Sequence, residues 1–147
     1  MNNPLIENTK EHESIDKLLS ESVDKEILNG LEDCLEVVKK ESRALASSLK
    51  RCFDNARKSM RYVLVYNLGK EDRAQSDEEL EEYLKNYLKD YFEKNDFMHY
   101  REFVRLLRAC TIDVGGKTSS KIKEMYNNFF FGKRLIAAYK LGRKQLF

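Results

Sequence analysis

The sequence contains little that would interrupt a helix. Its 147 residues include one proline, Pro4, and six glycines. Turns depend heavily on these two residue types, so their scarcity argues against a strand-and-turn fold and favours long helices. With 41% apolar and 11% aromatic residues the chain is still apolar enough to build a core, which excludes a disordered chain.

Metal-binding and disulfide patterns are also missing. The three cysteines, Cys34, Cys52 and Cys110, form no CxxC pair, and neither His12 nor His99 lies beside them in the sequence. We therefore expect no zinc or other metal site, no cofactor, and buried free thiols in a reducing compartment.

Targeting and membrane signals are absent as well. No window approaches 18 consecutive apolar residues, and the N-terminal stretch MNNPLIENTKEHES is polar throughout. We expect a soluble intracellular protein without a membrane span, most simply cytoplasmic, with a nuclear location left open.

Charge is divided unevenly along the chain, although the net charge is only +2. Residues 1–100 carry 16 Lys/Arg against 22 Asp/Glu, whereas residues 101–147 carry 11 against 3. This asymmetry indicates either an anionic partner for the basic end or two complementary faces of one bundle.

The organisation along the chain is that of one domain. Residues 1–13 are polar and contain Pro4, so we expect a flexible lead-in followed by a single helical domain over 14–147. Ser14 is a suitable cap for a first helix, and Asn29-Gly30 is a suitable end for it.

A heptad pattern follows and is the clearest periodicity in the sequence. It predicts one long helix, ended by Gly69, that packs within a bundle or pairs as a coiled coil with a second copy through the 31–63 seam. The seam residues are Leu31, Leu35, Val38, Ser42, Leu45, Leu49, Cys52, Ala56, Ser59 and Val63.

Three further helices are predicted downstream. Ser76 with Glu79 forms a capping box before an apolar stripe that ends at Phe92, and Asp96 can cap the next helix. A last helix follows the glycine pair and continues through Tyr139. The expected fold is all-α, a bundle of four to five helices, one of them long.

The stretch CTIDVGGKTSSK superficially resembles a nucleotide-binding loop. A phosphate-binding loop requires glycine five residues before Gly116, and this position holds Thr111. The preceding residues also have helical spacing, where a buried strand is required. We interpret the stretch as an interhelical loop with capping by Thr118 or Ser119.

The basic C-terminal third is the best candidate for nucleic-acid binding. Arg101, Arg105 and Arg108 have the spacing of one helix face, and further cations cluster near the chain end. The candidate nucleic-acid-binding residues are Arg101, Arg105, Arg108, Lys133, Arg134, Lys140, Arg143 and Lys144.

Surplus apolar residues point to a protein partner. Three consecutive phenylalanines cannot all face one core, and Phe131 is the one we expect to contact a partner. Leu146 and Phe147, at the end of the sequence, are the other two candidate contacts.

The sequence offers no nucleophile–base arrangement and no carboxylate pair in a tuned environment, so no catalytic residue is expected. The favoured function is a non-enzymatic protein–protein interaction module, such as an adaptor or assembly subunit. The alternative is a small nucleic-acid-binding protein. A death-domain-like or Bcl-2-like regulator matches only by analogy of fold.

Overall fold

The computed structural model describes residues 4–71 and 76–144, and every regular element in them is helical. This confirms the predicted all-α bundle. The elements are α1 (Pro4–Leu19), the π-helical turn η1 (Ser20–Asp24), α2 (Lys25–Ile27), α3 (Leu31–Glu41), α4 (Arg43–Arg57), α5 (Arg61–Lys70), α6 (Asp77–Tyr87), α7 (Lys89–Tyr91), the π-helical turn η2 (Phe92–Asp96), α8 (Phe97–Asp113), α9 (Gly116–Phe130) and α10 (Lys133–Lys144).

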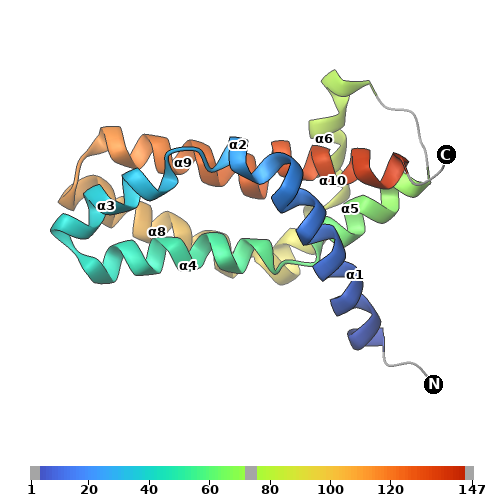
Figure 1. Cartoon of the computed structure of the whole chain (residues 1–147), viewed down its shortest axis with the longest axis horizontal. Coiled ribbons are helices and arrows are strands. Elements are labelled where there is room, and N and C mark those ends of the chain that lie inside the picture. The colour runs from blue at the N-terminus through green and yellow to red at the C-terminus, as the bar shows by residue number, and fades with distance from the viewer. Residues whose placement is uncertain (1–3, 72–75, 145–147) are drawn as a thin grey trace.

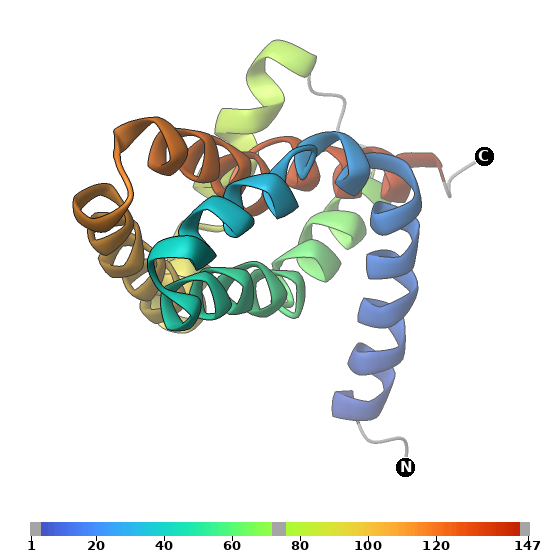
Figure 2. The same cartoon turned by 60° about the vertical axis from the view of Figure 1, so that its left-hand side comes forward.

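The helices pack as two groups, each around its own apolar cluster (Figures 1 and 2). One group contains α3, α4, α8 and α9, and the other contains α1, α5, α6 and α10. Both connections from the first group to the second are short: α4 leads into α5 and α9 leads into α10.

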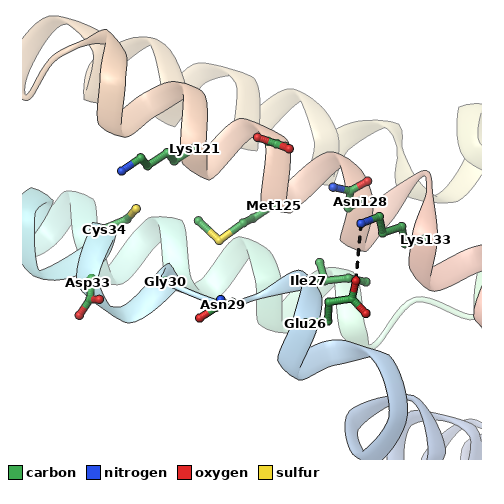
Figure 3. Close-up of a pocket in the computed structure, with 11 residues that line it drawn as sticks. Glu26, Ile27, Asn29, Gly30, Asp33, Cys34, Lys121, Met125, Asn128 and Lys133 are labelled. Carbon is green, nitrogen blue, oxygen red and sulfur yellow. Dashed lines mark ion pairs between the residues drawn. The ribbon is translucent and has the colours of Figure 1, made fainter.

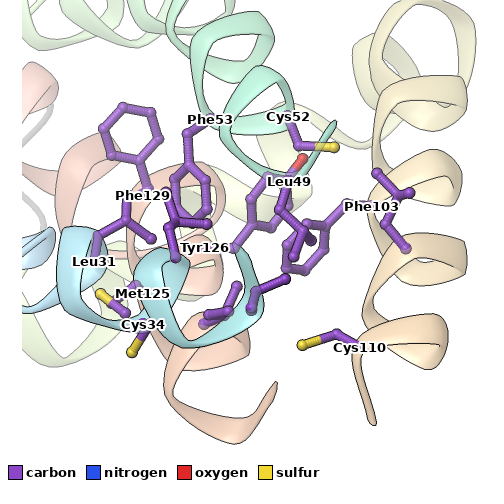
Figure 4. Close-up of a cluster of buried hydrophobic side chains, with 14 of the residues drawn as sticks. Leu31, Cys34, Leu49, Cys52, Phe53, Phe103, Cys110, Met125, Tyr126 and Phe129 are labelled. Carbon is purple, nitrogen blue, oxygen red and sulfur yellow. The ribbon is translucent and has the colours of Figure 1, made fainter. Parts of the chain in front are cut away.

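Aromatic rings form the centre of the first cluster (Figure 4). The rings of Phe103 and Tyr126 stack with their centroids 3.7 Å apart. Phe53 meets Phe103, Tyr126 and Phe129 edge-on, at centroid distances of 6.3, 5.4 and 5.9 Å. All four rings are buried, so α4, α8 and α9 are held together by ring contacts in addition to simple burial.

The second cluster depends on a very close crossing of α5 and α10. A Cβ atom on Gly69 would lie 2.1 Å from the backbone oxygen of Tyr139, and one on Gly142 would lie 1.9 Å from that of Tyr66. Two helices approach this closely only where neither carries a side chain. Gly69, predicted to end a helix, therefore lies inside α5 and makes the crossing possible.

The single long helix predicted from residue 31 is three helices in the structure. The first break is at Ser42, whose backbone is extended and whose hydroxyl oxygen accepts a hydrogen bond from the Leu45 amide at 3.2 Å. The second break is the turn at 58–60. Ser42 was assigned to the seam, but a serine that can cap the following turn competes with helix continuation.

The seam nevertheless closes within the chain. Apart from Ser42, which is half-buried, its residues are buried in the single chain. They face neighbouring helices of the same molecule. The predicted alternative, a homo-oligomer through the 31–63 seam, would need these side chains exposed, and the structure does not expose them.

Two other boundaries differ from the prediction, and two agree with it. The first helix begins at Pro4 instead of Ser14, because proline is well tolerated in a first helical turn. The last predicted helix is interrupted at residues 131–132, where the Asn127 carbonyl accepts hydrogen bonds from both amides. Gly30, at a φ of 89°, ends the first helical stretch as expected. The structure places the start of α6 directly after Ser76, also as expected, but the predicted capping box is not formed, because the Ser76 side chain makes no capping hydrogen bond.

Candidate functional site

The three predicted arginines of α8 lie on one exposed face. Arg101, Arg105 and Arg108 all point to solvent, and their stripe continues to Met98, 67% exposed, and Ile112, 83% exposed. We call these five residues the α8 face. Its spacing of three and four residues is that of a single helical stripe. It thus combines three cations with large apolar groups at both ends.

One of these arginines has a partner on the same helix. The Arg105 guanidinium donates to both carboxylate oxygens of Glu102, at 2.6 and 3.0 Å. This hydrogen bonding lowers the pKa of the Glu102 carboxyl below its usual value. Both side chains are solvent-exposed, so the pair holds the two side chains together but contributes little to the stability of the fold.

The basic residues of α10 do not join the α8 face. Figure 1 shows α8 and α10 in different helix groups. Lys133 lies 3.9 Å from Glu26, and Lys140 lies 3.3 Å from Asp77 at the acidic start of α6. The Arg143 guanidinium lies 5.8 Å from the Tyr139 ring centroid, and Lys144 is exposed at the end of α10. The candidate nucleic-acid-binding residues are therefore scattered.

Arg134 is not a surface residue at all. It is 0% exposed, and its Nε donates to Asp24 Oδ1 at 2.8 Å, while its Nη2 donates to Asp24 and to Asp16. Its guanidinium lies 4.3 Å from the ring centroid of Tyr62 and 4.4 Å from that of Phe129. Arg134 is therefore not available at the surface as a nucleic-acid contact, because its guanidinium is paired with the buried Asp24 and the half-buried Asp16.

A second buried arginine, Arg61, was not anticipated. It is 1% exposed, and its Nε and Nη2 both lie 2.9 Å from Asp96 Oδ2. Its guanidinium lies 3.6 Å from the Phe130 ring centroid and donates to the Phe130 carbonyl. Asp96, predicted as a helix cap, also accepts from the Ser59 hydroxyl and makes no capping hydrogen bond. The one sequence signal for this buried pair was the position of Arg61 within the apolar stretch MRYVLVY.

Phe131 borders a small apolar slot. The slot has a volume of about 220 Å³ and is lined by Arg61, Lys85, Leu88, Lys89, Phe92, Phe131 and Leu135. The half-buried Phe131 ring lies edge-on to Phe92, at 5.5 Å, and to Tyr100, at 5.2 Å. We call this the Phe131 slot. Leu146 and Phe147, the other predicted contacts, lie outside the described residues.

A larger cleft of about 420 Å³ separates the α2–α3 connection from α9 (Figure 3). Its lining mixes acids such as Glu26 and Asp33 with Lys121 and Lys133, and Cys34 lies at its side. Burial raises the pKa of the Cys34 thiol, so the sulfur is protonated at neutral pH and is not an activated nucleophile. Charges of both signs without a reactive group indicate an ordinary polar surface cleft.

The glycine loop has none of the surroundings of a phosphate-binding loop. It follows helix α8, and α9 begins at Gly116, directly after Gly115 at a φ of 132°. Thr118 and Ser119, predicted as caps, therefore lie within the first turn of α9. Among the described residues there is no group of three or more His, Cys, Asp or Glu side chains that could hold a metal ion.

The thiols should be nearly inert in the folded protein. Burial, together with the Glu102 carboxylate, raises the pKa of Cys52 to about 11, and Cys34 and Cys110 are also buried. At about pH 8 roughly one Cys52 in a thousand would be a thiolate, against about one in four for a free cysteine. We expect alkylation by iodoacetamide, followed by mass spectrometry, to be slow in the native state and to speed up as the pH rises. Rapid native labelling of Cys52, at the rate seen in guanidinium chloride, would contradict this.

Comparison of the chain with protein-family models, curated proteins and solved structures finds no match. Within residues 4–71 and 76–144, no helix is both long and apolar enough to cross a membrane.

Proposed function

We propose that this chain is a non-enzymatic helical module for protein–protein interaction, an adaptor or assembly subunit, and that the α8 face is a binding surface. The carrying observation is the exposure of Met98 and Ile112 at the ends of an arginine stripe. Phe97, 45% exposed, adds a third large apolar side chain on the same helix. Methionine, arginine and aromatic residues are enriched in protein interfaces, whereas isolated exposed apolar groups are usually scattered.

The charge distribution favours a protein over a nucleic acid. A phosphate backbone is bound by many cations along one track, and here Arg134 is buried while Lys133 and Lys140 pair with acids of their own chain. The apolar ends of the α8 face would gain nothing from phosphates. A partner with acidic and apolar groups would match both parts of the face.

A charge substitution at the ends of the α8 face provides the test. The double variant Met98→Glu/Ile112→Glu places carboxylates where the proposal requires apolar contact, and its fold should survive because both side chains are exposed. We expect quantitative affinity purification from the cells of origin to lose, by about tenfold or more, proteins that the unchanged chain retains.

The matched control is Val37→Glu on α3, a similar change at a side chain that is 42% exposed. It should retain those proteins. If the double variant and the control recover the same proteins in the same amounts, the α8 face is not the binding surface. Fluorescence anisotropy with oligonucleotides at about 50 and 200 mM salt tests the alternative, because phosphate binding weakens steeply with salt.

A further inference from the structure

The Phe131 slot has a more apolar lining than the cleft beside α9. Its walls are the apolar side chains of Leu88, Phe92, Phe131 and Leu135. Of the three charged residues that line the slot, Arg61 is buried and is already paired with Asp96 at 2.9 Å, whereas Lys85 and Lys89 are exposed. The buried part of the lining therefore offers apolar contact and no unpaired charge.

Size limits what the slot can accept. Small-molecule and cofactor sites have volumes of about 300–1,000 Å³, and at about 220 Å³ the slot is below that range. A pocket of this size suits one large side chain inserted from a partner, the arrangement typical of interface hot spots.

The rim adds a preference for negative charge. Lys85 and Lys89 lie one helical turn apart at the slot. Lys85 pairs with Glu81 at 3.2 Å, both side chains being half-exposed, whereas for Lys89 no ion pair is found among the described residues. A carboxylate next to an inserted side chain would meet Lys89 without displacing an existing partner.

We infer that the Phe131 slot binds a single leucine, methionine or aromatic side chain from an acidic segment of a partner protein, with a flanking carboxylate at Lys89. The inference rests on the proposed function, since it assigns a partner chemistry to an interaction module. It concerns a surface separate from the α8 face, and the two can fail independently.

The probe is a phage-displayed library of random dodecapeptides, selected on the immobilised full chain. We expect selected peptides to share one large apolar residue flanked by Asp or Glu. A fluorescein-labelled consensus peptide should then bind with a Kd that rises about five- to tenfold in Lys89→Glu. The control Lys94→Glu makes the same charge change on η2, away from the slot, and should leave the Kd unchanged.

A second variant tests the interior. Phe131→Ala removes one wall of the slot and should abolish peptide binding, with thermal unfolding used to show that the chain still folds. The double variant Met98→Glu/Ile112→Glu should bind the peptide normally. A failure of the proposed α8 face, measured by affinity purification, can therefore be distinguished from a failure of the Phe131 slot, measured by peptide binding.

Several results would overturn the inference. These are a consensus without acidic residues, equal Kd values for the Lys89→Glu and Lys94→Glu variants, and peptide-induced amide shifts in nuclear magnetic resonance spectra that avoid Leu88, Phe92 and Leu135. Light scattering that shows a dimer of the unchanged chain and a monomer of Phe131→Ala would assign the slot to a second copy instead.

Discussion

Replacing Arg134 by methionine should lower the free energy of unfolding by about 3–5 kcal/mol, the range found when one partner of a buried ion pair is removed. Methionine keeps much of the side-chain volume but leaves Asp24, 4% exposed, without the guanidinium that donates to both its carboxylate oxygens. Arg57, at 3.6 Å from Asp24, is too far away to donate a good hydrogen bond in its place. Chemical denaturation followed by circular dichroism measures the change.

The neighbouring residue supplies the control. Lys133→Met removes a cation whose pairing with Glu26 is long, at 3.9 Å, and solvent-exposed, so it should change stability by less than about 1 kcal/mol. Adding Asp24→Leu to Arg134→Met removes the stranded carboxylate and should restore part of the loss. If the free energy of unfolding of Arg134→Met lies within about 1 kcal/mol of that of the unchanged chain, the buried Arg134–Asp24 pair does not stabilise the fold as we expect.

The class of fold could be predicted from local features of the sequence. Few glycines and one proline, with apolar residues spaced three and four apart, are enough to predict helices packed in a bundle. Gly30 marks a boundary through its own positive φ, and Ser76 stands directly before α6 with an extended backbone, although its side chain makes no capping hydrogen bond. Signals of this kind do not depend on the rest of the chain.

Breaks inside the heptad seam were missed because side-chain spacing can continue across a backbone break. Leu35, Val38, Leu45 and Leu49 are all buried, although the chain is extended at Ser42 between them. Periodicity reports which side chains face the core, and it carries little information on whether the helix is continuous. The prediction of burial was therefore better than the prediction of helix length.

The buried ion pairs could not be predicted for a different reason. Arg134 and Asp24 are 110 residues apart, and Arg61 and Asp96 are 35 apart, so no local pattern links either pair. A weak signal for Arg134 existed: within α10 it lies four residues before Ala138, which is buried. This places it on the core side of a helix, where a lone cation requires a partner.

The two candidate surfaces also differ in how far the sequence could predict them. The α8 face was largely predictable, since three arginines at helical spacing belong to one continuous helix. The Phe131 slot was not, because Leu88, Phe92 and Leu135 come from separate elements of the chain. The sequence could single out Phe131 as surplus to the core, but only the fold shows what it borders.

Replacing Gly142 by alanine should separate α5 from α10 and destabilise the protein. The new Cβ would lie 1.9 Å from the backbone oxygen of Tyr66, and a backbone atom cannot move aside as a side-chain end can. Overpacking typically costs about 1–3 kcal/mol, and a clash with backbone atoms belongs at or above the upper end of that range, while the better helix propensity of alanine returns about 1 kcal/mol. We expect a net loss of about 2 kcal/mol or more in the free energy of unfolding, with Gly69→Ala similar, since its Cβ would lie 2.1 Å from Tyr139 O.

Gly116→Ala is the matched control, because it makes the same chemical change where no atom lies within 4 Å of the added Cβ. In the first turn of α9 alanine should be neutral or should stabilise the fold by about 0.5 kcal/mol, as it reduces the freedom of the unfolded chain. Thermal and denaturant unfolding of Gly142→Ala, Gly69→Ala and Gly116→Ala measure these changes in stability. Equal stability for Gly142→Ala and Gly116→Ala would contradict the close crossing. It would mean that α5 and α10 lie far enough apart to accept a methyl group at residue 142.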